Sequence, residues 1–379
     1  MNNKIKILHC SDFHLGAELS FLKNKAKSRR AEVLNTLSRI TDICSSQKIE
    51  LLIISGDLFD SNHVDSATLT SVKELFAGIP DTLVAVACGN HDYFAVDSPY
   101  SDDDWSSNVV IIYKKFTKIE YPKKNLRLCG SSFLSSYQEG CGSSLSVPDD
   151  NMINILVYHG DLVSENQTSK YNSVSVKTLE NSNFDYVALG HIHSATPLMR
   201  AGNTTYAYSG TPDGNGFDEC GKKGVYAGYV YKHRTELAFI ETSSRTYENV
   251  SVDISALTSN SRIIQAIIKK LEDTYGSSYQ ENLYRITLTG STPDGFLPGI
   301  KFIHTELQDL LYFVIIVNKS RPDTDISILS SDFSLKGIFV RKMLSKINSC
   351  ETAEEKEMYE NALYIGLKAF DGEVSYYEN

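Results

Sequence analysis

The chain has 379 residues, 41% hydrophobic and 22% charged, which is ordinary usage for a globular protein and long enough for one large domain or two. Its formal net charge is 37 − 47 = −10, so bulk attraction to nucleic acid is excluded, and any nucleic-acid role must come from local basic patches or a partner. The longest apolar run, Leu310 to Val317, is far shorter than the roughly 20 residues of a membrane span.

The N-terminal segment and the cysteines bear on location. Residues Met1 to Cys10 contain no signal-peptide hydrophobic region. The seven cysteines are scattered and form no C-x-x-C pair, which is typical of a reducing compartment and argues against a disulfide framework or a thiolate zinc site. We therefore expect a cytoplasmic protein without a membrane segment.

Five short, β-rich apolar runs in the first two-thirds of the chain each end in polar or metal-binding residue types. The runs are 5–9, 51–54, 83–88, 153–158 and 186–189, and the polar segments after them are 11–14, 55–60, 89–92, 159–161 and 190–193. Apolar runs of this length indicate buried strands. Between the first two runs, residues 31–44 carry a helical stripe of Val33, Leu37 and Ile40. This alternation predicts an α/β layered domain with its site at the carboxyl ends of the strands.

The composition changes near residues 242–250. Beyond that point, residues 262–271 carry a helical apolar stripe that Gly276 can end, and residues 283–289 and 312–317 have strand patterns. Two amphipathic helices follow, and Thr352 with Glu355 forms a capping-box signature at the start of the second. We expect a larger domain over 1–250, which contains all five polar segments, and a smaller α+β domain over 255–379.

The polar segments contain a set of side chains suited to metal binding. Five of the nine histidines lie in them, beside Asp12, Asp57 and Asn90. Imidazole, carboxylate and amide oxygen together suit Mn²⁺, Fe²⁺ or Zn²⁺. There are enough ligands for two ions, which a bridging carboxylate would hold about 3.5–4 Å apart, as in a phosphoryl displacement. The alternative is that these side chains only satisfy loop backbones, and the five ordered segments count against it.

The ordered motifs Asp-x-His, Gly-Asp-x-x-Asp, Gly-Asn-His-Asp, His-Gly and Gly-His-x-His resemble the calcineurin-like metallophosphoesterase superfamily over about residues 4–215. The resemblance implies an α/β layered sandwich of two β-sheets flanked by helices, with a smaller C-terminal α+β cap domain. It implies that one metal is bound by Asp12, His14 and His193, the other by Asn90, His159 and His191, and both by the bridging Asp57. It also implies two catalytic residues, the general acid His91 and its hydrogen-bonding partner Asp60.

Two further acidic residues and four further histidines are interpreted as structural. Asp92 and Asp161 lie inside the motif segments, and we interpret them as residues that fix the loops. Four histidines match no motif and are interpreted as ordinary structural or surface residues: His9, His63, His233 and His304.

The motifs also bear on the substrate. Protein phosphatases of this superfamily have Arg after the second Asp of Gly-Asp-x-x-Asp, whereas Ser61 and Asn62 follow Asp60 here. Residues 12–16, 56–61 and 209–224 are similar to the DNA-repair nuclease branch, the SbcD and YhaO type. This similarity implies a two-metal hydrolase that acts on DNA as an exonuclease. The two ions are expected to be divalent, with Mn²⁺ preferred over Fe²⁺ or Zn²⁺. The alternatives are a phosphodiesterase for nucleotides or other small phosphate esters, and a regulatory nuclease subunit of an SMC-like ATPase complex.

Two further features concern partners. The basic stretch Lys23, Lys25, Lys27, Arg29 and Arg30 either contacts the DNA backbone or is a solvated helix face, and a weaker basic cluster follows at 114–118. The two C-terminal helices either bind a partner such as an SbcC-like coiled-coil ATPase or pack on their own domain. The sequence leaves open whether a homodimer forms.

Overall fold

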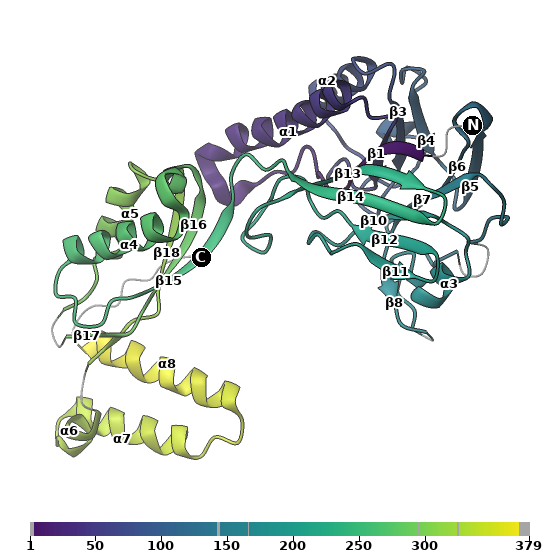
Figure 1. Cartoon of the computed structure of the whole chain (residues 1–379). Coiled ribbons are helices and arrows are strands. Elements are labelled where there is room, and N and C mark those ends of the chain that lie inside the picture. The colour runs from purple at the N-terminus through teal and green to yellow at the C-terminus, as the bar shows by residue number, and fades with distance from the viewer. Residues whose placement is uncertain (1–3, 142–144, 166, 294–295, 324–325, 371–379) are drawn as a thin grey trace. The chain divides into compact units, whose positions relative to one another are not determined.

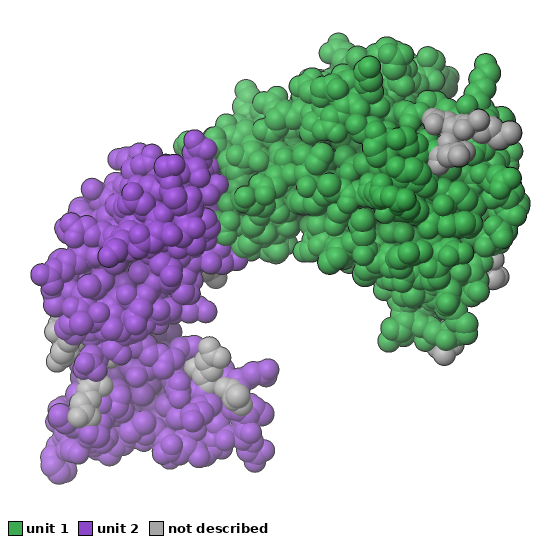
Figure 2. All heavy atoms as spheres, viewed as in Figure 1, with its two compact units in different colours: residues 1–248 green, residues 249–379 purple. Residues whose placement is uncertain are grey.

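The computed structural model describes residues 4–141, 145–165, 167–293, 296–323 and 326–370 (Figure 1). The chain divides into two compact units, Met1–Glu248 and Asn249–Asn379, which Figure 2 shows in green and purple.

The first sheet of unit 1 has six strands in the order β14-β13-β1-β2-β3-β4. Its four strands β1 to β4 run parallel, and β13 pairs antiparallel with β1 and β14. The strands are β1 (Lys4–Cys10), β2 (Leu51–Ser55), β3 (Leu83–Ala87), β4 (Val109–Ile112), β13 (Gly224–Tyr231) and β14 (Arg234–Glu241). The parallel strands therefore all present their carboxyl ends at one edge.

The second sheet also has six strands, in the order β11-β12-β10-β7-β6-β5. Strands β6, β7, β10 and β12 are parallel, and β5 and β11 are antiparallel edges. The strands are β5 (Thr117–Tyr121), β6 (Leu126–Ser131), β7 (Ile153–His159), β10 (Tyr186–Gly190), β11 (Met199–Ala201) and β12 (Thr204–Tyr208). A separate short pair is formed by β8 (Leu162–Val163) and β9 (Val174–Ser175).

The core of unit 1 consists of layers, because the central strands are buried on both faces. Ile7 and Ile53 of the first sheet and Ile155 of the second belong to one cluster of buried side chains between the sheets. On the outer face of the first sheet, Val33 and Leu37 pack with strand residues beneath the two helices α1 (Ala26–Gln47) and α2 (Ser66–Ala77). A third cluster lies under α3 (Val176–Glu180). The predicted α/β class, two sheets flanked by helices, is confirmed.

Unit 2 combines a small sheet with helices. Strands β15 (Tyr247–Asp253), β16 (Leu283–Thr289) and β18 (Phe313–Asn318) form the sheet, and a short pair is made by β17 (Ser291–Thr292) and β19 (Arg321–Pro322). Helices α4 (Asn260–Tyr275) and α5 (Ile300–Gln308) share one buried apolar cluster with this sheet. A second cluster holds together α6 (Ile326–Ser331), α7 (Leu335–Asn348) and α8 (Ala353–Phe370).

The predicted helix signals of unit 2 are present. Gly276 ends α4 with a positive φ of 67°, a conformation that costs glycine little. The Thr352 hydroxyl accepts a hydrogen bond from the backbone N–H of Glu355 at 3.1 Å, as the capping signature requires. All seven cysteines are free thiols. In the part of the chain that the structure describes, we find no helix with both the length and the apolar character to cross a bilayer.

Candidate metal centre

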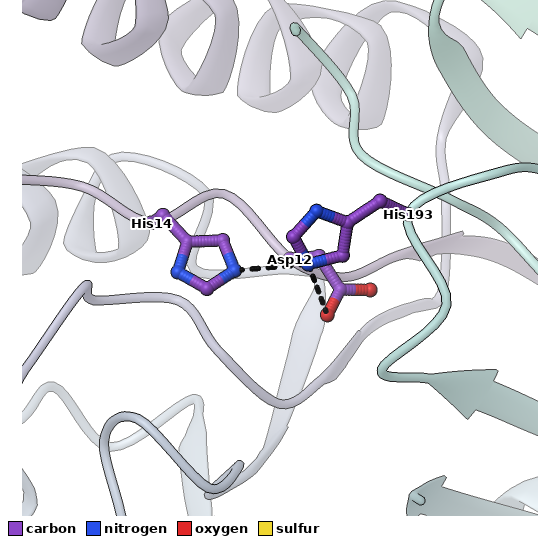
Figure 3. Close-up of side chains that lie close together, drawn as sticks. All are labelled: Asp12, His14 and His193. Carbon is purple, nitrogen blue, oxygen red and sulfur yellow. Dashed lines mark hydrogen bonds and ion pairs between the residues drawn. The ribbon is translucent and has the colours of Figure 1, made fainter. Parts of the chain in front are cut away.

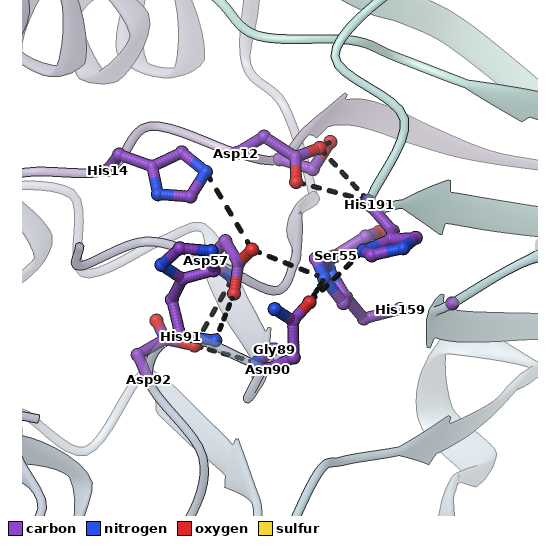
Figure 4. A network of polar contacts seen from close by, with 12 residues as sticks. Asp12, His14, Ser55, Asp57, Gly89, Asn90, His91, Asp92, His159 and His191 are labelled. Carbon is purple, nitrogen blue, oxygen red and sulfur yellow. Dashed lines mark hydrogen bonds and ion pairs between the residues drawn. The ribbon is translucent and has the colours of Figure 1, made fainter. Parts of the chain in front are cut away.

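The two sheets bring the five polar segments to a common edge. Asp12 and His14 follow β1, Asp57 follows β2, and Asn90 follows β3, all at carboxyl ends of the first sheet. His159 ends β7, and His191 and His193 follow β10 in the second sheet. Figure 4 shows that side chains from both sheets point toward one another there. The structure therefore brings together the side chains that were predicted to bind metal.

The loops reach this arrangement through an unusual backbone. Asp12, His14 and Asp57 have φ values of 56°, 50° and 49°, and His191 has 102°. Positive φ is uncommon for residues with a side chain and is found preferentially at functional sites. A Cβ at Gly89 would lie 2.1 Å from Oδ1 of Asp57, so only glycine lets the loop after β3 pass this carboxylate.

The first cluster consists of Asp12, His14 and His193 (Figure 3). Nδ1 of His14 lies 3.2 Å from a carboxylate oxygen of Asp60, and Nδ1 of His193 is hydrogen-bonded to the Glu219 carboxylate. Each Nδ1 therefore carries the proton, which leaves a lone pair on each Nε2 in the neutral rings. These two Nε2 atoms face each other at 3.2 Å.

In the neutral rings the two facing lone pairs would repel each other, and a shared cation, either a proton or a metal ion, removes the repulsion. Asp12 is completely buried beside them, with Oδ1 4.0 Å from Nε2 of His193. The set of two imidazoles and a carboxylate suits a divalent transition metal. The donor atoms and their orientations thus fit an ion bound by Asp12, His14 and His193.

The second cluster consists of Asn90, His159 and His191. Nδ1 of His159 donates to the Ser55 carbonyl at 2.7 Å, so the lone pair of its Nε2 faces Oδ1 of Asn90 at 3.1 Å. His191 turns Nδ1 toward the same Asn90 oxygen, also at 3.1 Å, while its Nε2 lies 3.3 Å from the carboxylate of Asp161. Three electron-rich atoms again converge, as a second ion requires.

Asp57 lies between the two clusters (Figure 4). Its Oδ2 atom is 3.4 Å from Nε2 of His159 and 3.7 Å from Nε2 of His14, so one carboxylate oxygen faces both clusters. Burial alone raises the pKa of this carboxyl, but His159 and His14 outweigh it and hold the pKa below its ordinary value. Asp57 is therefore ionised at neutral pH.

The buried acids make the clusters attractive to positive charge. Burial lowers the pKa of His14, yet Asp60, Asp57 and Asp12 together raise it to about 9. Burial likewise opposes protonation of His159, and Asp57 still raises its pKa to about 9. Without a metal, protons supply the positive charge that this surplus of carboxylates demands.

His91 lies at the open side of the centre. Its ring is exposed and meets the ring of His14 edge-on, with centroids 4.7 Å apart, and its backbone N–H donates to Oδ1 of Asp57 at 3.0 Å. Nδ1 of His91 lies 3.1 Å from the backbone carbonyl oxygen of Asp60. The expected hydrogen bond between Asp60 and His91 thus runs through the main chain, and the Asp60 carboxylate is engaged with His14 instead.

Two supporting contacts were not identified from the sequence. Glu219 holds the ring of His193. Asp161 fixes its loop by accepting a hydrogen bond from the Ser169 hydroxyl, as interpreted, but its other carboxylate oxygen also faces the ring of His191. Such carboxylates fix the tautomer and orientation of ligand histidines. The segment 216–219 offers only a similarity to a nuclease branch, and no spacing rule connects Glu219 with His193.

Asp92 fixes the loops, as predicted. It is completely buried, and its carboxylate accepts backbone N–H groups from Asp57, Phe59 and Gly89 at 3.2, 3.0 and 2.7 Å. Burial, followed by the nearby Asp57, raises its pKa to about 6. Asp92 therefore joins the loops after β2 and β3 beneath the bridging carboxylate.

The basic stretch after the first motif divides in the structure. Arg29 is fully buried and forms an ion pair with the buried Asp213, so the interpretation as a DNA contact is wrong for this residue. Lys23 and Lys27 are exposed. Arg30 is half-buried and donates to the Glu18 carbonyl at 2.7 Å.

Comparisons with known proteins agree with this geometry. The sequence model of the family "Calcineurin-like phosphoesterase" matches residues 5–195. The uncharacterized metallophosphoesterase YhaO of Bacillus subtilis is 23% identical, over 82% of this chain and 78% of its own length. The DNA double-strand break repair protein Mre11 of Sulfurisphaera tokodaii is 25% identical, over 92% of this chain and 91% of its own. The SbcD nuclease subunit of Escherichia coli K12 is 22% identical, over 95% of this chain and 98% of its own.

Proposed function

The chain belongs to the calcineurin-like phosphoesterase family, and on this basis we propose that it is a two-metal phosphodiesterase that cleaves DNA, acting as a repair exonuclease. Metal-dependent hydrolysis is the activity of the family. The single observation that carries the proposal is the convergence of histidine ring nitrogens on two sides of the Asp57 carboxylate.

The chain's own residues have distinct tasks in this reaction. Asp12, His14 and His193 would hold one ion, Asn90, His159 and His191 the other, and Asp57 both. When bound, such ions polarise the phosphate and stabilise the charge that develops in the transition state. The set of nitrogen and oxygen donors favours Mn²⁺ in our proposal, with Fe²⁺ or Zn²⁺ as alternatives.

His91 would deliver the proton to the departing sugar oxygen. Its Nδ1 is held by the Asp60 carbonyl, so Nε2 is the atom left to hold and release a proton. Because the ring is exposed beside His14, it can meet a substrate that occupies the open side of the centre. General acid catalysis of this kind requires hydrogen-bond reach to the leaving oxygen.

Two observations support DNA as the substrate. Ser61 and Asn62 stand where protein phosphatases of the superfamily carry Arg and Gly, so the group that holds a phosphoprotein is absent from these positions. Two of the relatives are named as a double-strand break repair protein and a nuclease subunit. The same proposal locates the protein in the cytoplasm, where its seven free thiols stay reduced.

A partner ATPase is part of the proposal. The relative from Escherichia coli is named as one subunit of a nuclease. In unit 2, large apolar side chains are exposed on and between α6 and α7, namely Ile328, Phe333, Leu335 and Ile338, and on α8, namely Met358 and Ile365. Exposed apolar groups that gather on helices are typical of protein-binding surfaces. We propose that this unit binds an SMC-like coiled coil and helps to select DNA.

The test compares two substrates with Mn²⁺ present. We expect the purified chain to degrade an end-labelled DNA duplex, measured on a gel, and to hydrolyse a chromogenic phosphodiester more slowly. Hydrolysis of the small diester without attack on DNA would favour the alternative, a phosphodiesterase for nucleotides and other small esters. If neither substrate is cleaved until an SMC-like ATPase is added, the chain is a regulated subunit.

A further inference from the structure

A row of loops extends from the metal centre along the carboxyl edge of unit 1. The segment after β4 pairs with the segment after β6, because the backbone N–H of Ser132 donates to the Lys114 carbonyl at 3.1 Å. The segment after β6 in turn pairs with residues 169–172, through the N–H of Gln138 and the Lys170 carbonyl at 2.8 Å. These backbone hydrogen bonds fix the order of the loops.

The row ends at a proposed metal ligand. The ring of Tyr171 packs against the ring of His191, with centroids 4.8 Å apart, and Tyr137 packs against Tyr171 at 5.6 Å. Tyr137 is therefore two ring contacts away from the second cluster. Tyr113 lies further along the row, on the loop that pairs with Ser132.

The exposed side chains of this row are aromatic and basic. Tyr113 and Tyr137 are 50% and 59% exposed, and they are the only exposed tyrosines in the described part of the chain. Each is accompanied by an ammonium group, since Nζ of Lys114 lies 5.3 Å from the ring centre of Tyr113 and Nζ of Lys170 5.9 Å from that of Tyr137. Tyr113, Lys114, Tyr137 and Lys170 are called the tyrosine row below.

The net charge of the chain is −10, so a group of exposed positive charges is not expected from the overall composition. Lys115 adds a further exposed positive charge to the row. The exposed acids on these loops are Glu139 and Glu165, and Glu165 is paired with Lys177. Exposed aromatic rings lose the hydrophobic stabilisation that burial provides. Rings that can stack with bases, beside amines that neutralise phosphates, form the combination that binds single-stranded nucleic acid.

We propose that the tyrosine row binds single-stranded DNA and guides it to or from the metal centre. Bases stack on Tyr137 and Tyr113, while Lys170 and Lys114 contact the phosphates between them. Because Tyr171 contacts both Tyr137 and His191, a single DNA strand bound along the row can place one of its phosphates at the second cluster. The inference rests on the proposed nuclease function and adds to it a binding surface for the unpaired strand.

The test measures binding without hydrolysis. Fluorescence anisotropy in EDTA follows a labelled 12-residue oligothymidine, with Tyr137→Ala and Tyr113→Ala compared with the unaltered chain. We expect each change to weaken binding about tenfold, the usual effect of removing a stacking ring. Tyr137→Phe should bind normally because the ring remains. An oligomer of the same length without bases should bind the unaltered chain weakly and should not distinguish the variants.

A half-buried tyrosine with a lysine over its ring, elsewhere in unit 1, serves as the control. Nζ of Lys4 lies 4.1 Å from the ring centre of Tyr229, at the amino end of β1 and so away from the carboxyl edge. Tyr229→Ala should leave oligothymidine binding unchanged. Unchanged binding in Tyr137→Ala and Tyr113→Ala would overturn the proposal, and so would equal losses for the oligomers with and without bases, which would indicate charge contact alone.

Hydrolysis separates this inference from the proposed function. All variants should cleave the small chromogenic diester in Mn²⁺ at the normal rate, since the metal ligands are untouched. If cleavage of DNA and small diester is normal while the tyrosine variants bind normally, the row is wrong and the nuclease function stands. If oligothymidine binding depends on the rings while neither diester is cleaved, the row stands and the proposed catalysis fails.

Discussion

Asp60 serves two histidines with different atoms: its carboxylate lies 3.2 Å from Nδ1 of His14, and its backbone carbonyl oxygen lies 3.1 Å from Nδ1 of His91. The first contact fixes a proposed metal ligand and the second a proposed acid. A side-chain substitution removes only the first. This division makes the two roles separable by mutation.

Asp60→Ala should therefore act through the metal. Loss of a carboxylate that orients a ligand histidine typically lowers metal affinity by about 10- to 100-fold, so activity at low Mn²⁺ should fall on DNA and on an activated diester alike. Excess Mn²⁺ should restore both. Titration of activity with Mn²⁺ checks this, and a defect confined to DNA that excess metal does not repair would contradict it.

His91→Ala should keep both metals and lose turnover. A positioned acid contributes about 10² to 10⁴ in rate, and the loss should be much smaller for a diester with a nitrophenolate leaving group, which departs without a proton. Rates on DNA and on the activated diester, with metal content measured in parallel, decide the matter. Equal losses on both substrates would assign His91 to phosphate positioning.

Asp57→Asn should release both ions, because one carboxylate oxygen faces both clusters. Asp12→Asn should mainly lower occupancy of the first site. Metal analysis after dialysis measures the stoichiometry directly. Two tightly held ions in Asp57→Asn would refute the bridging role.

Lys23→Gln and Lys27→Gln should reduce the dependence of duplex binding on salt. If each lysine contacts one phosphate, each change lowers the slope of log affinity against log salt by about 0.9. Arg29→Gln should leave that slope unaltered and destabilise the fold by about 3–5 kcal/mol, because it strands the buried Asp213. Salt titrations and urea unfolding test the two effects, and an unaltered slope in the lysine variants would make them a solvated face.

His9 should make the protein sensitive to acid. It is completely buried and accompanied by the Tyr186 hydroxyl 2.9 Å from Nδ1. Burial, opposed by a backbone hydrogen bond to Leu189, lowers its pKa from 6.5 to about 3. Below pH 6.5 the unfolded chain therefore binds a proton at His9 that the folded chain does not bind. The stability that this difference contributes is fully present above pH 6.5 and is lost as the pH falls toward 3, by at most about 1.4 kcal/mol per pH unit.

His9→Gln offers the measurement for this effect. Glutamine keeps a polar partner for Tyr186 but does not titrate in this range. Urea unfolding at pH 7 and pH 4.5 should show a smaller loss of stability in the variant than in the unaltered chain. The same pH dependence in both proteins would assign the acid sensitivity to other groups.

The sequence predicted the parts of the molecule whose causes are local. The five buried strands before the polar segments and the stripe of α1 lie where apolar patterns placed them. The hairpin of β13 and β14 was not predicted, because β14 alternates between half-buried and exposed positions and presents no apolar run. Edge strands of this kind depend on pairing, which a local pattern does not encode.

In the site, too, the features with local causes were predicted and those that depend on distant contacts were not. Motifs identified the groups on strand ends, but Glu219 is 26 residues from His193 in a loop without regular spacing. Arg29 looked like one more charge in a basic run because its partner Asp213 is 184 residues distant. The sequence alone does not distinguish an arginine in a buried ion pair from the exposed lysines beside it, because burial depends on the tertiary fold.

The positive φ values of Asp12, His14 and Asp57 restrict how this site can decay in evolution. Asparagine and glycine adopt such angles at little cost, whereas β-branched residues are strained by them. Replacement of any of these three residues by Asn or Gly should therefore keep the loops and the sandwich intact, whereas replacement by Val or Ile should strain them. Substitutions at these positions can therefore remove the activity while the main-chain conformation of the centre is retained.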